Sequence, residues 1–217
     1  MKAKHIFSIV MISLSLLFLT SCIDYVQSVS FDGESIYGYT RVTLSKTMTE
    51  WMDEEGDASI NDYLGDELDD LPYDMDYNLV DTDLEEGFEF SFVIDNNDIP
   101  DEMEDYIPLF DKKMNRYEVP FLLGGSYTPE LEESIKSEED EMSEAMVMLM
   151  LSSVKCKVMI DKNIIGDFKY AYFEGVEEGT YYDIPYFDYG NGYCFEIPFI
   201  YLTSNLPYDF TRFYIEY

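Results

Sequence analysis

Oxygen-bearing side chains in an acidic stretch of the chain are the residues best suited to bind a metal ion. Their spacing places acids or amides at positions 1, 3, 5 and 12 of an EF-hand-like calcium loop: Asp74, Asp76, Asn78 and Glu85. Position 6 of that loop is Leu79, whereas an EF-hand needs Gly there for its sharp turn. Two interpretations stay open, a looser Ca²⁺ site among these acids and a solvated acidic loop, and we favour the loop. We expect no other cofactor.

Residues for nucleophilic or acid–base catalysis are scarce. His5 is the single histidine, and it precedes the body of the chain, so Ser-His-Asp and Cys-His mechanisms are poorly supplied. Ser152 to Lys155 matches S-x-x-K and resembles the nucleophile motif of penicillin-recognising enzymes, but its companions S-D-N and K-T-G do not occur. The 46 Asp and Glu residues form too many carboxylate pairs to single one out for glycoside hydrolysis. We expect a protein that is not an enzyme.

Two cysteines of the chain body, Cys156 and Cys194, fall on segments that we expect to be strands. An exported protein can form a disulfide between them, provided that their Cα atoms lie within about 7 Å. The alternative is two buried thiols that act as small apolar side chains. The sequence leaves both interpretations open.

The N-terminus carries the features of an export signal. Lys2 and Lys4 precede an apolar run over residues 6–19 that is too short for a comfortable membrane span. An aliphatic residue, two small residues and a cysteine then follow: Leu19, Thr20, Ser21 and Cys22. This order is similar to the lipobox of bacterial lipoproteins, in which the thiol receives a diacylglycerol.

The resemblance to lipoproteins implies a signal peptide over residues 1–21 and a mature chain that begins at acylated Cys22. Two or three acyl chains such as palmitate anchor a protein stably, whereas one binds only marginally. Ile23 rather than Asp follows the cysteine, which resembles an outer-membrane-directed lipoprotein under the enterobacterial sorting rule. We therefore expect an exported protein, held by lipid at the outer membrane or cell surface rather than the inner membrane.

Charge and composition limit the partners of the chain. The formal net charge is −33 over 217 residues, which argues against nucleic acid because phosphate binding needs clustered Lys and Arg. Apolar residues make up 47% of the chain, enough to build a core. We expect a single domain over residues 22–217 with an acidic insertion over 53–86.

Hydrophobic periodicity predicts an α+β fold, in which a mostly antiparallel sheet of hairpins packs against one long helix and several short ones. Residues 24–44 read as a hairpin around a tight turn at 32–33. Thr128, Pro129 and Glu130 form a good helix start, and the long helix would run over about 129–151. Short helices are expected over 45–54 and near 64–71. The remaining strand candidates are 88–95, 117–123 (an edge strand because of Pro120), 154–160, 167–176, 194–203 and 210–217.

Residues 22–95 resemble the start of LppM-type lipoprotein domains. The likeness rests on the order Cys22, short strand, Asp-Gly, second strand, Leu-Ser-Lys over 44–46, helix and strand. The acidic 53–86 insertion departs from that pattern. The resemblance implies a place in the cell envelope and no catalytic residues.

The aromatic C-terminal part suggests the function. Residues 168–217 contain 11 Tyr and seven Phe, interspersed with acids. We expect a non-enzymatic, lipid-anchored cell-envelope lipoprotein that presents an acidic, Tyr-rich surface to a protein or glycan partner. A small-molecule or lipid binding module between helix 129–151 and the sheet is one alternative. A carboxylate-based hydrolase of envelope polysaccharide is the other.

Overall fold

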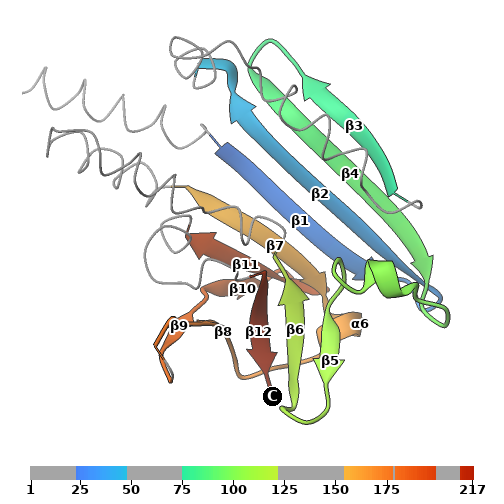
Figure 1. The fold of residues 1–217 in the computed structure, drawn as a ribbon, viewed down its shortest axis with the longest axis vertical. Coiled ribbons are helices and arrows are strands. Elements are labelled where there is room, and N and C mark those ends of the chain that lie inside the picture. The colour runs from blue at the N-terminus through green and yellow to red at the C-terminus, as the bar shows by residue number, and fades with distance from the viewer. Residues whose placement is uncertain (1–22, 48–74, 122–153, 178, 199–210) are drawn as a thin grey trace, which may run out of the picture.

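Two β-sheets make up the part of the chain that the computed structural model describes, residues 23–47, 75–121, 154–177, 179–198 and 211–217 (Figure 1). Strands account for 62% of these residues and helices for 7%, and none of their helices reaches seven residues. The expected α+β class with a long packing helix is therefore wrong for this part of the protein, which is a β-structure. The predicted helix over 129–151 lies outside the described residues, as do 48–54 and 64–71.

The larger sheet has seven strands in the spatial order β10-β11-β7-β1-β2-β4-β3, and the smaller has five in the order β5-β6-β12-β8-β9. The strand bounds are β1 Ile23–Phe31, β2 Ser35–Ser45, β3 Met75–Asp81, β4 Glu85–Asp95, β5 Leu109–Asp111, β6 Arg116–Pro120, β7 Lys155–Asp161, β8 Tyr170–Glu174, β9 Tyr181–Asp183, β10 Tyr186–Asp188, β11 Gly192–Pro198 and β12 Arg212–Glu216. Two short helical elements accompany them, η1 (Asp101–Met103) and α6 (Lys162–Ile165).

The β1–β2 hairpin confirms the prediction for 24–44, with Ile23 opposite Leu44 and Phe31 opposite Ile36. Its turn is held by Asp32, whose carboxylate accepts hydrogen bonds from the backbone N–H groups of Glu34 and Ser35 at 3.0 and 2.9 Å. These bonds lower the pKa of Asp32 to about 2. Gly33 has φ 107°, a conformation that favours glycine.

The two faces of the seven-stranded sheet differ because side chains alternate along each strand. One face carries apolar residues such as Tyr25, Val158 and Phe195, all of them fully buried. The opposite face carries ion pairs, including Lys155 with Glu196 at 2.6 Å between strands β7 and β11. The apolar face is the one available for packing against the second sheet.

The five-stranded sheet covers the β1, β7 and β11 part of that apolar face. Its contribution to the core includes Val119, Phe121, Phe173, Phe213 and Ile215, all of them buried. The sheets interlock through aromatic pairs that join Phe195 to Phe213 at 5.3 Å and Tyr25 to Phe121 at 5.4 Å between ring centroids. Full burial of such side chains contributes roughly 1.5–3 kcal/mol each, so this interface makes a large contribution to stability.

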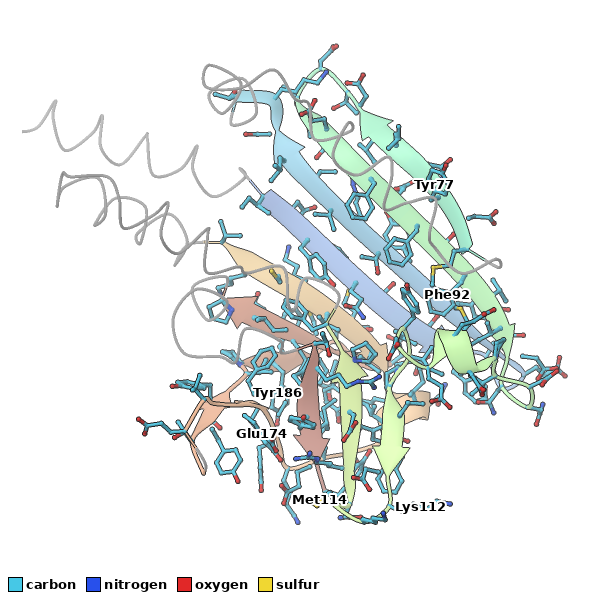
Figure 2. All side chains as sticks on the ribbon, in the orientation of Figure 1. Tyr77, Phe92, Lys112, Met114, Glu174 and Tyr186 are labelled. Carbon is cyan, nitrogen blue, oxygen red and sulfur yellow. The ribbon has the colours of Figure 1, made fainter. Side chains whose placement is uncertain are left out.

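A second cluster lies over strands β2, β3 and β4. Phe90, Phe92 and Ile94 pack there against Met103 and Ile107, which come from the segment around η1. Figure 2 shows Phe92 beside that segment. The segment around η1 thus supplies apolar residues that cover the part of the sheet that the second sheet does not reach.

Gln27 is a polar side chain at the centre of the interface, only 2% exposed. Its amide nitrogen donates to the backbone oxygen of Pro120 at 3.0 Å, and its amide oxygen accepts from the hydroxyl of Tyr25 at 2.6 Å. Because a buried polar group costs about 1–3 kcal/mol when it loses its partner, these bonds hold β1 in one register against β6.

Two strands differ from their sequence-based descriptions. Residues 75–81 were expected to lie in acidic loop but form β3, an edge strand in which five of seven side chains are exposed. An edge position accepts Asp and Asn, which are poor strand formers, because one side of the strand meets solvent. Strand β6 was expected at an edge because of Pro120, yet it lies between β5 and β12. Pro120 is its last residue, where the missing N–H does little harm.

We predict that Gly38→Ala lowers the free energy of unfolding by about 1–3 kcal/mol, the usual cost of overpacking. Gly38 lies opposite Phe92, and an added Cβ would come within 2.1 Å of the Phe92 ring. Urea unfolding followed by circular dichroism measures the effect. The double variant Gly38→Ala with Phe92→Leu should be more stable than Gly38→Ala alone, because the smaller side chain makes room. If the loss of unfolding free energy in the double variant equalled the sum of the losses in Gly38→Ala and Phe92→Leu, the proposed clash would be contradicted.

Candidate binding groove

An open groove of about 480 Å³ lies where α6 meets the β5–β6 hairpin and the end of β12. Three aromatic rings, two amides and an ammonium group line it: Phe110, Tyr117, Tyr217, Asn115, Asn163 and Lys162. Backbone and aliphatic groups of residues 164–166 complete the lining, which contains no carboxylate side chain. The groove thus combines an apolar wall with a few polar groups, the composition typical of small-ligand sites.

The four-residue helix α6 forms one wall. Asp161 caps it by accepting a hydrogen bond from the backbone N–H of Asn163 at 2.9 Å, and Gly166 with φ 60° ends it. Ile165 is 1% exposed and anchors the turn in the core. With this anchor inside, the turn presents Lys162 and Asn163 to the groove.

The aromatic wall consists of Phe110, Tyr117 and Tyr217. The Phe110 ring lies 5.0 Å from Tyr117 and 6.0 Å from Tyr217, and the two tyrosine rings lie 5.9 Å apart. Phe110 is 42% exposed, so part of its ring is free to contact a ligand. The hydroxyl of Tyr117 donates to the backbone oxygen of Ile164 at 2.6 Å, which ties the aromatic wall to α6.

The hydroxyls of the groove are neutral at physiological pH. Burial raises the pKa of Tyr117, and burial together with the neighbouring Tyr117 raises the pKa of Tyr217 to about 12. The backbone oxygen of Tyr217 accepts from the ammonium of Lys169, which fixes the end of β12. The wall therefore offers rings and uncharged hydroxyls.

The ammonium of Lys162 is held at the side of the groove. It pairs with Asp188 at 2.6 Å and lies 4.8 Å from the centroid of the Tyr193 ring. The hydrogen bond to Asp188 raises the pKa of Lys162 and lowers that of Asp188, so both are charged at neutral pH. Asn115, another lining residue, has φ 55°, a left-handed conformation that asparagine tolerates. It is the last residue of the β5–β6 turn, which also carries Lys112 and Met114 (Figure 2).

The groove lies at the far end of strand β1 from residue 23. Strand β7 runs parallel to β1, with Val29 opposite Ile160, and α6 follows directly after β7. The length of β1 at about 3.3 Å per residue separates Ile23 from this end by about 26 Å. Figure 1 shows α6 and β5 at the end of the sheet where β1 stops.

The predicted calcium ligands do not form a loop in the described residues. Asp76 and Asn78 are exposed on strand β3, and Glu85 begins strand β4, where its carboxylate pairs with Arg41 and accepts from Thr43. An extended strand holds Cα atoms two residues apart at about 6.7 Å, which does not bring their oxygens together as a calcium loop does. No group of three His, Cys, Asp or Glu among the described residues could hold a metal ion. Asp74 lies outside them.

The possible disulfide is not formed, and both thiols are free and buried. Strands β7 and β11 are neighbours, but Cys156 lies opposite Ile197 and Cys194 lies opposite Met159. This offset of three residues puts the two side chains on opposite faces of the sheet. The two cysteines therefore act as small apolar side chains, as the second interpretation holds. Burial raises the pKa of Cys156 to about 12.

The remaining sequence candidates lie outside the described residues. They are the lipobox residues Leu19, Thr20, Ser21 and Cys22, which stay a prediction, and Ser152 of the S-x-x-K match. Lys155 of that match is described, and it pairs with Glu196 on the sheet surface. No helix in the described part of the chain is long and apolar enough to span a membrane.

Except for Tyr217, the groove residues escaped the sequence analysis, which directed attention to the aromatic segment 168–217. Phe110 and Tyr117 come from a short hairpin, Asn163 comes from a single helical turn, and Tyr217 follows directly after β12. Only tertiary structure brings these segments together, and no spacing in the sequence signals it. Comparison of the chain with family models, with curated proteins and with solved structures finds no match.

We predict that Tyr117→Phe lowers the free energy of unfolding by about 1 kcal/mol, because it removes the hydrogen bond to Ile164 while the ring stays. Urea unfolding of the full chain provides the measurement. Tyr181→Phe is the matched control, since the Tyr181 side chain is 60% exposed and its hydroxyl can bond to water. Equal stability of Tyr117→Phe and the unmodified protein would mean that this bond does not hold α6.

Proposed function

We propose that this protein is a non-enzymatic, lipid-anchored protein of the bacterial cell envelope that binds a glycan in the groove between α6 and the β5–β6 hairpin. The observation that carries the proposal is the side-by-side arrangement of partly exposed aromatic rings and amide groups in one open groove. The anchor would be the acylated Cys22 that the lipobox-like sequence predicts.

The chemistry of sugars fits this groove. One face of a pyranose ring presents C–H groups that pack on an aromatic ring, while its rim presents hydroxyls that need donors and acceptors. Phe110 supplies a partly exposed ring, and the amides of Asn115 and Asn163 supply both donors and acceptors. The neutral hydroxyl of Tyr217 adds a further polar group.

Charge favours a neutral or weakly anionic saccharide. The chain carries a formal net charge of −33, which repels a strongly anionic polymer at long range. The groove itself is lined by the ammonium of Lys162 and by no carboxylate side chain. A glycan with few negative groups would thus meet no electrostatic repulsion from the side chains of the groove.

Position favours an anchored binding protein. Strand β1 begins at Ile23, immediately after the predicted lipid attachment, and the groove lies at the other end of that strand. With a lipid on Cys22, the length of β1 would separate the groove from the attachment point by about 26 Å. The binding site would then face away from the bilayer without a long tether.

The two alternative functions receive less support. A hydrolase of envelope polysaccharide needs two carboxylates that face each other across an aromatic cleft, and the groove lining supplies none. A lipid or small-molecule pocket against helix 129–151 would depend on residues outside the described part. We therefore propose binding rather than turnover at the groove.

Titration of the full chain in detergent with chitohexaose, cellohexaose and soluble muropeptides tests the groove, with heat of binding as the readout. We predict that at least one of these glycans binds and that Phe110→Ala weakens its binding about tenfold, through loss of the ring contact. Tyr77→Ala is the matched control, because Tyr77 is similarly exposed, at 45%, on the distant strand β3. Absence of binding by all three glycans, or equal affinity of Phe110→Ala and Tyr77→Ala, would contradict the proposal.

Fractionation of bacteria that express the protein tests the anchor separately. We predict that Cys22→Ala moves the protein from the membrane fraction to the soluble fraction, since the sulfur that receives the lipid is lost. Cys194→Ala serves as the control and should stay with the membrane, because Cys194 is a buried thiol within strand β11. Full retention of Cys22→Ala in the membrane fraction would show that the lipobox interpretation is wrong.

A further inference from the structure

The outer face of the five-stranded sheet carries a group of tyrosines, which we call the tyrosine face. It consists of Tyr170, Tyr172, Tyr181 and Tyr214, contributed by strands β8, β9 and β12. Tyr214 lies directly opposite Tyr172 across the β12–β8 pair. The alternate residues Phe213 and Ile215 point into the core, so the tyrosines point outward.

The rings of the tyrosine face contact one another. Tyr172 lies 5.6 Å from Tyr170, 5.1 Å from Tyr181 and 5.6 Å from Tyr214 between ring centroids. Tyr172 is covered by its neighbours and is 4% exposed, whereas Tyr170 and Tyr181 are 43% and 60% exposed. The result is a continuous aromatic surface with two rings open to solvent.

One end of this surface already holds a cation. The guanidinium carbon of Arg116 lies 3.7 Å from the centroid of the Tyr214 ring. The same group donates to the Tyr172 hydroxyl at 3.2 Å and to the Glu174 carboxylate at 2.6 Å. Ring, hydroxyl and carboxylate together hold a guanidinium, which is the arrangement expected of a cation–π site.

The two exposed rings have carboxylates beside them as well: Glu216 lies opposite Tyr170 on one side and Arg116 on the other, and Glu174 lies opposite Tyr181. Asp183 lies opposite Tyr172 on strand β9, two residues from Tyr181, and it is exposed. Glu216 accepts a hydrogen bond from the Tyr170 hydroxyl. Each exposed ring therefore has a carboxylate close to it on the same face of the sheet.

Charge complementarity defines the partner. Four carboxylates lie on this face with two guanidinium groups, those of Arg116 and Arg212: Glu118, Glu174, Asp183 and Glu216. Arg116 pairs with Glu174 at 2.6 Å and Glu118 at 3.8 Å, so Asp183 and Glu216 are the carboxylates that remain for a partner. Arg212 is itself paired with Asp105 at 2.7 Å. The whole chain adds a long-range attraction for cations, because its formal net charge is −33.

We propose that the tyrosine face docks an arginine-rich segment of a basic protein partner. Guanidinium groups of the partner would stack on Tyr170 and Tyr181 and pair with Asp183 and Glu216, as Arg116 stacks on Tyr214 and pairs with Glu174. Arginine suits the face better than lysine, because its planar group stacks on a ring while it binds a carboxylate through two N–H groups. This surface is separate from the groove residues, so the inference does not rest on glycan binding.

Fluorescence anisotropy of labelled oligoarginine, with the full chain in detergent at low ionic strength, tests the docking. The double variant Tyr170→Ser with Tyr181→Ser keeps the net charge and should bind about tenfold more weakly, because it loses two exposed cation–π contacts. Tyr37→Ser with Tyr77→Ser is the matched control, since these tyrosines are 40% and 45% exposed on the other sheet. Oligolysine should bind several-fold more weakly than oligoarginine.

Equal affinity of the two double variants for oligoarginine would overturn the proposal, because binding would then reflect bulk charge only. Lack of oligoarginine binding by the unmodified chain would overturn it as well. Asp183→Asn provides a second reading that leaves every ring in place. It should weaken oligoarginine binding several-fold, and a reduction no larger than that of Asp76→Asn on strand β3 would again mean bulk charge. Circular dichroism of each variant establishes that the fold is retained.

Discussion

The parallel pairing of strands β1 and β7 is the constraint on which the rest of the structure depends. It joins the neighbouring strands β1, β2, β4 and β3 to the strands β7, β11 and β10, so that all seven form one sheet. The strands are distant in sequence, so burial of their apolar side chains must offset the entropy lost in closing the long loop between them. Tyr25 of β1 and both Val158 and Ile160 of β7 are fully buried beneath the second sheet. Gln27 fixes the relative position of the two sheets, because its amide donates a hydrogen bond across the interface to the backbone oxygen of Pro120.

Two surfaces follow from this arrangement. Because β7 runs parallel to β1, the turn α6 comes at the end of the sheet away from residue 23, where the β5–β6 hairpin and the end of β12 meet it. Because the five-stranded sheet uses one face for the core, its other face is left to carry tyrosines and carboxylates. The groove offers rings with amides, neutral hydroxyls and one ammonium group, whereas the tyrosine face offers rings with carboxylates. The two surfaces thus suit partners of different chemistry.

Local patterns in the sequence predicted much of the β-structure and little of the site. The hairpin at 24–44 and the strands near 88–95 and 154–160 alternate clearly, so their positions and inward faces could be predicted. Strand β3 could not, because Asp76 and Asn78 are unfavourable in strands and only its edge position makes them acceptable. The groove could not either, because Phe110, Asn163 and Tyr217 are distant in sequence and meet only through the packing of the two sheets. The calcium hypothesis relied on spacing, and the disulfide hypothesis relied on the expected export of the protein. The extended strands place both sets of residues apart.

The measurement that tests the central claim most directly is a nuclear magnetic resonance titration of the isotope-labelled full chain in detergent with the glycan that binds best. Backbone amide shifts report on each segment separately, and they do not depend on any substitution. The account predicts concentration-dependent shifts at Phe110, Asn115, Tyr117, Asn163 and Tyr217, and no shifts on strand β3 or on the tyrosine face. Shifts spread over β3 or confined to the tyrosine face, with the groove amides unchanged, would contradict it.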